Sequence, residues 1–135
     1  MAASASSAAP PEYLGRPNLG ANPLPFSEAV KVGDMLYLSG QIGMVDGKVP
    51  EGIEAQTKAT MDAIADVLKR NGRSMDDVVK CTVMLDDMAD WPAFNKVYIT
   101  YIKPGRLPAR SAFGADGLAL GAKLEVECMA YAGDK

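Results

Sequence analysis

The chain has 135 residues, of which 48% are hydrophobic and 23% charged, and this composition is typical of a single soluble globular domain. Its net charge is −3 and it has no cluster of Lys and Arg, which argues against nucleic-acid binding, and no apolar run is long enough to span a membrane. Because there is no histidine, Ser-His-Asp and Cys-His catalysis and most zinc sites are excluded, so any chemistry must use carboxylates, Arg, Lys, Tyr, hydroxyls or backbone groups.

The first segment, residues 1–22, is rich in Ala, Ser, Pro and Gly and has no hydrophobic period. It predicts a mobile arm, anchored at most at Tyr13 and Leu14, in front of a single domain over residues 23–135. Residues 2–9 also have the small-residue composition of a processed export signal. We expect a cytoplasmic protein. The alternative, which the composition of residues 2–9 suggests, is a periplasmic or exported location.

A tight hairpin is the first regular structure predicted. Residues 27–32 and 35–39 have strand character and flank Gly33-Asp34, a two-residue loop of the kind that needs positive φ. An amphipathic helix over residues 53–71 follows, and Gly72 ends it. Its apolar stripe, at helical spacing, consists of Thr60, Met61, Ile64, Val67 and Leu68.

The second half of the chain predicts a strand over residues 78–85, a second helix, and two strands around 109–114 and 122–131. Asp90 is the expected N-cap of the second helix and Pro92 lies in its first turn. The side chains expected on the buried face of that helix are Trp91, Phe94, Val97, Tyr98 and Tyr101. The order is ββαβαββ, which predicts a mainly antiparallel sheet with both helices on one face.

The other face of this sheet has no helix to cover it. On the last strand, alternation separates one apolar set from a mixed set that combines carboxylates with apolar bulk. The apolar set is Leu124, Val126, Cys128 and Ala130, and the mixed set is Glu125, Glu127, Met129 and Tyr131. A mixed face of this kind favours burial against further copies of the chain, so we expect a homo-oligomer.

The two cysteines, Cys81 and Cys128, lie far apart, each within an apolar run. They do not form a CxxC pair, so they indicate neither a metal site nor a redox motif. We expect both to be buried, reduced thiols of the core.

Four segments resemble the Rid family (YjgF, reactive intermediate deaminase). In chain order they are Leu38-Ser39-Gly40-Gln41-Ile42, the stretch from Asp90 to Tyr98 with Asn95, Pro108-Ala109-Arg110-Ser111, and Lys123-Leu124-Glu125-Val126-Glu127. The resemblance covers residues 24–132. It implies an α+β, chorismate-mutase-like ββαβαββ fold that forms a homotrimer with clefts between subunits. It also implies hydrolysis of 2-aminoacrylate, through its imine tautomer, to pyruvate and ammonia, without cofactor or metal.

The resemblance also assigns roles to individual residues. It implies that Arg110 binds the carboxylate of the substrate and that Glu125 holds the attacking water. Ser39 and Asn95 would line the cleft. These residue types suit the reaction, because a guanidinium grips a carboxylate with two parallel hydrogen bonds and a glutamate can accept the proton of the water.

Three further positions belong to the expected site. Ala112 stands where many deaminating members have Cys, and Phe26 stands where many have Tyr. Each change removes a polar atom from the cleft and affects which substrate fits. Backbone carbonyls near Ala112 and Phe113 are the expected acceptors for the leaving ammonia.

Other interpretations remain open from the sequence. Arg110 could pair structurally with Glu125 or Glu127. The protein could bind small 2-keto or amino acids without catalysis, deaminate a different imine or enamine, or be an endoribonuclease or translation inhibitor. The acidic balance and the absence of histidine argue against the last of these.

Overall fold

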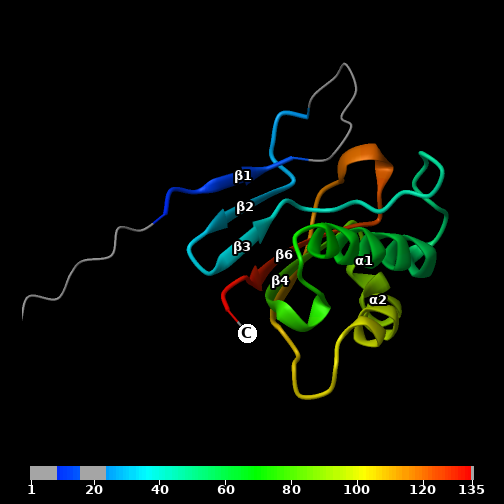
Figure 1. Ribbon diagram of the computed structural model, residues 1–135. Helices are drawn as coiled ribbons and strands as arrows, with labels where there is room; N and C mark the ends of the chain where they lie inside the picture. The colour runs from blue at the N-terminus through cyan, green and yellow to red at the C-terminus, as the bar shows by residue number, and fades with distance from the viewer. Residues whose placement is uncertain (1–8, 16–23, 135) are drawn as a thin grey trace, which may run out of the picture.

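The computed structural model describes residues 9–15 and 24–134 as two helices on one face of a six-stranded sheet (Figure 1). The order of the strands is β1-β2-β3-β6-β4-β5. The elements are β1 (Glu12–Leu14), β2 (Ala29–Val32), β3 (Met35–Leu38), α1 (Ile53–Arg70), β4 (Val78–Leu85), α2 (Trp91–Tyr98), β5 (Ala109–Gly114) and β6 (Leu124–Tyr131). The predicted α+β class is confirmed, and so is the mostly antiparallel pairing, since β4 and β5 form the one parallel pair among these strands.

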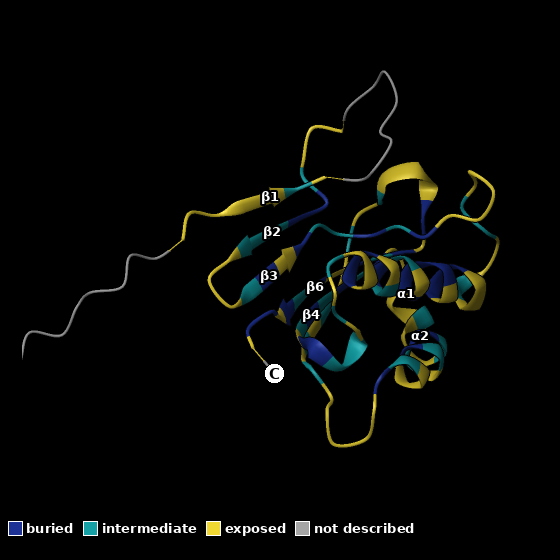
Figure 2. Ribbon diagram, in the orientation of Figure 1, coloured by how far each residue is buried: buried dark blue, intermediate teal, exposed yellow. Residues whose placement is uncertain are grey.

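The predicted ββαβαββ order of elements lacked β1, which is the edge strand next to β2. Its three residues pair antiparallel with β2, and Tyr13 lies opposite Val30. The strand is short and mostly exposed (Figure 2), so its sequence has no hydrophobic period from which it could be predicted. Part of the expected arm is therefore in the sheet, whereas residues 1–8 and 16–22 of that arm lie outside the described residues. The expected domain start at residue 23 lies there too and stays a prediction.

The predicted hairpin and first helix are confirmed. Gly33, in the loop between β2 and β3, has a φ of 57°. All five residues of the predicted stripe of α1 are buried, because that face packs on the sheet. Asn71 caps the C-terminus of α1, and Gly72 follows it with a φ of 72°, as a residue at the C′ position requires.

Asp90 is the N-cap residue of α2 and Pro92 lies in its first turn, as predicted. The side chain of Asp90 makes no capping hydrogen bond, however, because a 3₁₀ turn over Met88–Asp90 runs directly into the helix. The capping side chain is that of Asp87, which accepts a hydrogen bond from the backbone N–H of Ala89 at 2.9 Å. Trp91 is 39% exposed rather than buried, and only Phe94 and Tyr98 of the predicted face are fully in the core.

The core lies between α1, α2 and the inner face of the central strands β6 and β4. The predicted alternation along β6 is confirmed, since Leu124, Val126, Cys128 and Ala130 are all buried on the helix side.

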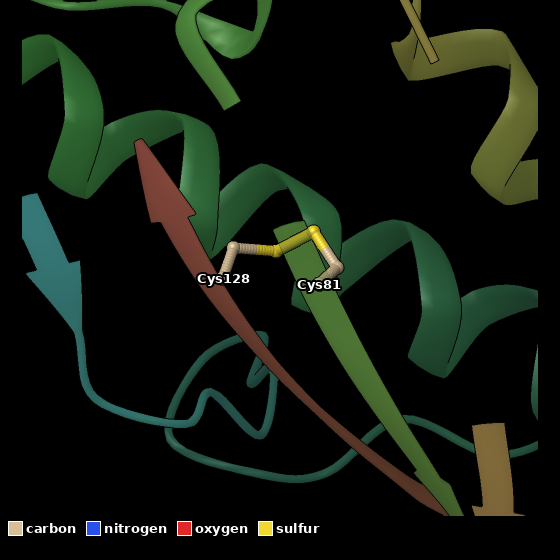
Figure 3. The surroundings of a disulfide bond; sticks show 2 residues. All are labelled: Cys81 and Cys128. Carbon is tan, nitrogen blue, oxygen red and sulfur yellow. A yellow bond between two sulfur atoms is a disulfide. The ribbon is translucent and has the colours of Figure 1, made fainter. Parts of the chain in front are cut away.

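Cys81 of β4 lies directly opposite Cys128 of β6, and the two form a disulfide (Figure 3). Both residues are buried as expected, but the prediction of reduced thiols is wrong. Antiparallel pairing brings the two side chains to the same face of the sheet, which 47 residues of separation conceal in the sequence.

The segment between β3 and α1 packs closely on α1 at Gly43. The backbone N–H of Gly43 donates to Oγ1 of Thr60 at 3.0 Å. A Cβ on Gly43 would overlap the backbone of Ala59 and Thr60, and would lie 2.6 Å from the carbonyl oxygen of Ala59. Because these neighbours are the backbone of a packed helix, they cannot move aside as a flexible side chain would.

Replacing this glycine should therefore destabilise the fold. We expect Gly43→Ala to lower the free energy of unfolding by about 1–3 kcal/mol, the usual cost of overpacking. Urea denaturation measures the change. Gly114→Ala is the matched control, because its Cβ would meet Met88 at an ordinary 3.4 Å. Equal stability of the two variants would contradict the close approach at Gly43.

Candidate active site

Arg110 projects from β5 towards the helices. Its register partner in the parallel pair is Cys81, whose side chain is in the core, so Arg110 shares the helix-side face. The guanidinium carbon lies 4.8 Å from the ring centre of Tyr98, 5.7 Å from that of Phe94 and 5.9 Å from that of Trp91. Three aromatic rings of α2 thus hold the cation in place through their faces.

No carboxylate in the described part of the chain neutralises this guanidinium. Among residues 9–15 and 24–134, Arg110 forms no ion pair, although Arg70 pairs with both Glu28 and Asp66. The structural pairing with Glu125 or Glu127 is ruled out within one chain, because both glutamates project from the opposite face of the sheet. The half-buried Arg110 is therefore available to bind an anion.

A pocket of about 520 Å³ lies beside Arg110. Its lining residues are Asn95, Lys96, Tyr98, Ile99, Leu107, Pro108 and Arg110. Oδ1 of Asn95 and the hydroxyl of Tyr98 are buried, and neither has a hydrogen-bond partner in the described part of the chain. Buried polar atoms normally have hydrogen-bond partners. Two such atoms without partners, next to an unpaired cation, therefore indicate a binding site for a polar ligand.

Tyr98 is the residue of this pocket that sequence reasoning assigned to the core alone. Burial raises the pKa of Tyr98, although the positive charge of Arg110 opposes the shift, so the hydroxyl stays protonated at neutral pH. The signal was present in the spacing: Asn95 and Tyr98 are three residues apart and therefore share one side of α2. What the sequence lacked was the position of Arg110 relative to that side.

The other predicted residues gather on the outer face of the sheet. Glu125 of β6 lies opposite Met84 of β4, which in turn lies beside Phe113 of β5. The Glu125 carboxylate lies against Gly40 and makes no hydrogen bond to another described residue. Phe113 is 48% exposed on this face.

Ser39 belongs to the same side of the molecule, immediately before Gly40. Its Oγ donates a hydrogen bond to the carbonyl oxygen of Ser27 at 2.6 Å. This bond ties the Ser39 segment to the one that carries Phe26, which is 52% exposed.

The seven predicted site residues thus form two groups on opposite faces of the sheet. Arg110, Asn95 and Ala112 lie on the helix side, with Ala112 packed against the core. Glu125, Ser39 and Phe113 lie on the outer side, and Phe26 is beside them. One chain does not bring Arg110 and Glu125 together.

Over the described residues, no cluster of three or more His, Cys, Asp or Glu could hold a metal. No helix among these residues is long and apolar enough to cross a membrane.

The unpaired hydroxyl of Tyr98 should cost stability. We expect Tyr98→Phe to raise the free energy of unfolding by about 1 kcal/mol, because the variant no longer buries a polar group without a partner. Tyr101→Phe is the matched control and should lower it by about 1 kcal/mol, since Tyr101 donates to Asp62 at 2.5 Å. Chemical denaturation of the three proteins gives both values. Equal losses in the two variants would mean that the Tyr98 hydroxyl has a partner after all.

Comparison with known proteins places the chain in a family. The family model described as Endoribonuclease L-PSP matches residues 20–132. Reactive Intermediate Deaminase A of Arabidopsis thaliana, described as chloroplastic, is 39% identical over 109 residues, which are 78% of this chain and 58% of that protein. The 2-iminobutanoate/2-iminopropanoate deaminase of Mus musculus is 38% identical over 81% of this chain and 82% of its own length.

The fold agrees with the sequence match. The crystal structure of the yeast protein YEO7 superposes with a TM-score of 0.82 at 32% identity, covering 92% of this chain and all of that one. The resemblance carried by Ser39-Gly40-Gln41 and Pro108-Ala109-Arg110-Ser111 is thereby confirmed over nearly the whole domain. The chain belongs to the Rid family, whose model bears the name Endoribonuclease L-PSP.

Proposed function

We propose that this protein hydrolyses small 2-imino acids, such as the imine tautomer of 2-aminoacrylate, to 2-keto acids and ammonia. The observation that carries the proposal is the unpaired guanidinium of Arg110 beside two buried polar atoms without partners. The deaminase names of the mouse and Arabidopsis relatives support the same chemistry.

Arg110 binds the carboxylate of the imino acid. A planar guanidinium forms two parallel hydrogen bonds with a carboxylate, each worth about 1.5–3 kcal/mol. The rings of Trp91, Phe94 and Tyr98 restrict the orientation of the guanidinium, so the bound carboxylate has a defined direction. The C=N carbon is one bond from the carboxylate, so it is then held at a fixed position relative to Arg110.

The two unpaired polar atoms complement the rest of the ligand. Oδ1 of Asn95 accepts a hydrogen bond, which suits the N–H of an imine or of the leaving ammonia. The Tyr98 hydroxyl donates one, which suits a carboxylate oxygen or the oxygen of the attacking water. The backbone carbonyls at Ala112 and Phe113 remain expected acceptors for the ammonia. No cofactor enters the proposed reaction.

Glu125 is the proposed base. It takes a proton from water as the hydroxide adds to the C=N carbon, and it returns this proton to the imine nitrogen, which gives a carbinolamine. The hydroxyl of the carbinolamine then passes its proton through Glu125 to the nitrogen, the C–N bond breaks, and ammonia leaves as the C=O bond forms. Because Arg110 and Glu125 of one chain lie on opposite faces of the sheet, the complete site combines Arg110 of one chain with Glu125 of another. The homotrimer that the family resemblance implies supplies such a cleft and covers the outer face, with Ser39 and Phe26 at its wall.

Two alternative functions are distinguished from this proposal by experiment. A protein that binds 2-keto acids without turnover would use Arg110 in the same way. The second alternative is endoribonuclease activity, which the family description names, although the negative net charge and the lack of histidine argue against it. Release of keto acid from enzymatically generated 2-aminoacrylate separates the three: the proposal requires acceleration over the spontaneous rate, whereas saturable binding alone favours the sensor. RNA cleavage that is lost in Arg110→Ala favours the nuclease.

The compartment is a separate prediction. We expected a cytoplasmic protein. Disulfides persist mainly in oxidising compartments, so the Cys81–Cys128 bond favours the periplasmic or exported alternative.

Removing the carboxylate anchor should abolish turnover. We expect Arg110→Ala to lower kcat/KM by roughly 10³-fold or more, because two charge-assisted hydrogen bonds are lost. Arg106→Ala is the matched control, since Arg106 is exposed and its guanidinium bonds the carbonyl of Asp76 at 3.2 Å, away from the pocket. Keto-acid release measures both variants, and size-exclusion chromatography checks the assembly. Near-wild-type turnover by Arg110→Ala would rule the assignment out.

Removing the base should affect rate but not binding. We expect Glu125→Gln to lower kcat by roughly 10²–10⁴-fold while the Kd for a 2-keto acid changes little, because Arg110 is untouched. Glu127→Gln changes the next residue on the same face of β6 and should retain activity. Calorimetric titration with pyruvate gives the Kd. If Glu125→Gln binds no keto acid either, the division of roles between Arg110 and Glu125 is wrong.

A further inference from the structure

We propose that Gly40 is a positioning residue for the reaction: its missing side chain leaves the space in which the Glu125 carboxylate lies. The inference rests on the proposed role of Glu125 as the base. It adds a residue that determines where the base is held.

The geometry around Gly40 is specific to one neighbour. The three heavy atoms nearest to an added Cβ all belong to the side chain of Glu125. Oε2 would overlap the added carbon outright, Cδ would lie 3.0 Å from it and Cγ 3.3 Å. A carboxylate and a Cβ cannot share this space, so either the backbone at residue 40 or the side chain of Glu125 has to move.

The backbone at Gly40 is held on both sides. Before it, the Ser39 N–H donates to the carbonyl of Glu28 at 3.0 Å, in addition to the Ser39 Oγ bond to Ser27. After it, Gln41 and Val126 exchange two backbone hydrogen bonds, of 2.8 and 3.1 Å. Retreat of Gly40 would break several of these bonds, whereas the end of the Glu125 side chain can rotate about its own torsions. The carboxylate is therefore the part that yields.

Gly40 differs from the other glycines that matter in this fold. Gly33 needs its positive φ, and Gly43 is pressed against the backbone of α1. Gly40 has no positive φ, so alanine can adopt its backbone conformation, and the contact it would disturb is a flexible side chain. A substitution here should leave the fold intact and displace one functional group.

The test is kinetic. In Gly40→Ala we expect kcat for 2-aminoacrylate-derived imine to fall roughly 10²-fold, the scale of loss for a reacting group displaced by about 1 Å. The KM and the Kd for pyruvate should change less than about threefold, because the added methyl group meets the side chain of Glu125 and leaves the guanidinium of Arg110 untouched. Gly15→Ala is the matched control, since its added Cβ meets nothing within 4 Å. Unchanged kcat in an active enzyme would overturn the inference.

A double-mutant cycle shows whether Gly40 acts through Glu125. The variant carrying Gly40→Ala and Glu125→Gln together should be no slower than Glu125→Gln alone, because the displaced base has already lost its function. Multiplying rate losses would show a general structural effect and refute the positioning role.

A crystal structure of Gly40→Ala separates this inference from the proposed function. If the wild-type protein hydrolyses no imine, the proposed function fails, but the position of the carboxylate can still be observed. A Glu125 carboxylate displaced over an unmoved backbone at residues 39–41 supports the inference. A carboxylate in its original place beside the added methyl group refutes it.

Discussion

The pleat of β6 is the constraint on which the rest of the molecule depends. Side chains alternate along a strand, so each residue that β6 contributes to the core is followed by one on the outer face. Leu124, Val126, Cys128 and Ala130 form the centre of the core below α1. Glu125 is placed on the outer face by the same alternation, and no rotamer change can bring it to the helix side.

The consequence is a division of the chemistry between two faces. The helix-side face carries the cation, which three aromatic rings hold without neutralising it. Cation–π contacts contribute about 0.5–2 kcal/mol each and leave the hydrogen-bond donors of the guanidinium free. The outer face carries the carboxylate, which packs on a glycine and is equally free of ionic partners among the described residues. Keeping the two charges apart within a chain prevents them from neutralising each other, so that both remain available in the site that we propose between chains.

The segment that follows β3 connects the fold to the proposed site within five residues. Gly43 allows this segment to pack on the backbone of α1, so its lack of a side chain serves the fold. Gly40, three residues earlier, gives room to a carboxylate, so its lack of a side chain serves the proposed chemistry. Ser39 and Gln41 hold the backbone on the two sides of Gly40 by hydrogen bonds to Ser27, Glu28 and Val126.

The sequence by itself determined the elements whose signals are local. The hairpin at Gly33, the stripe of α1 and the alternation of β6 were all predicted from periodicity and turn chemistry, because short-range sterics and amphipathic burial produce them. The tertiary structure alone decided the features that depend on register between distant segments. Pairing of β4 with β6 joined Cys81 to Cys128, and pairing of β4 with β5 turned Arg110 towards α2 and away from Glu125. A shift of one residue in either pairing would reverse these faces, and no local pattern records which register the chain adopts.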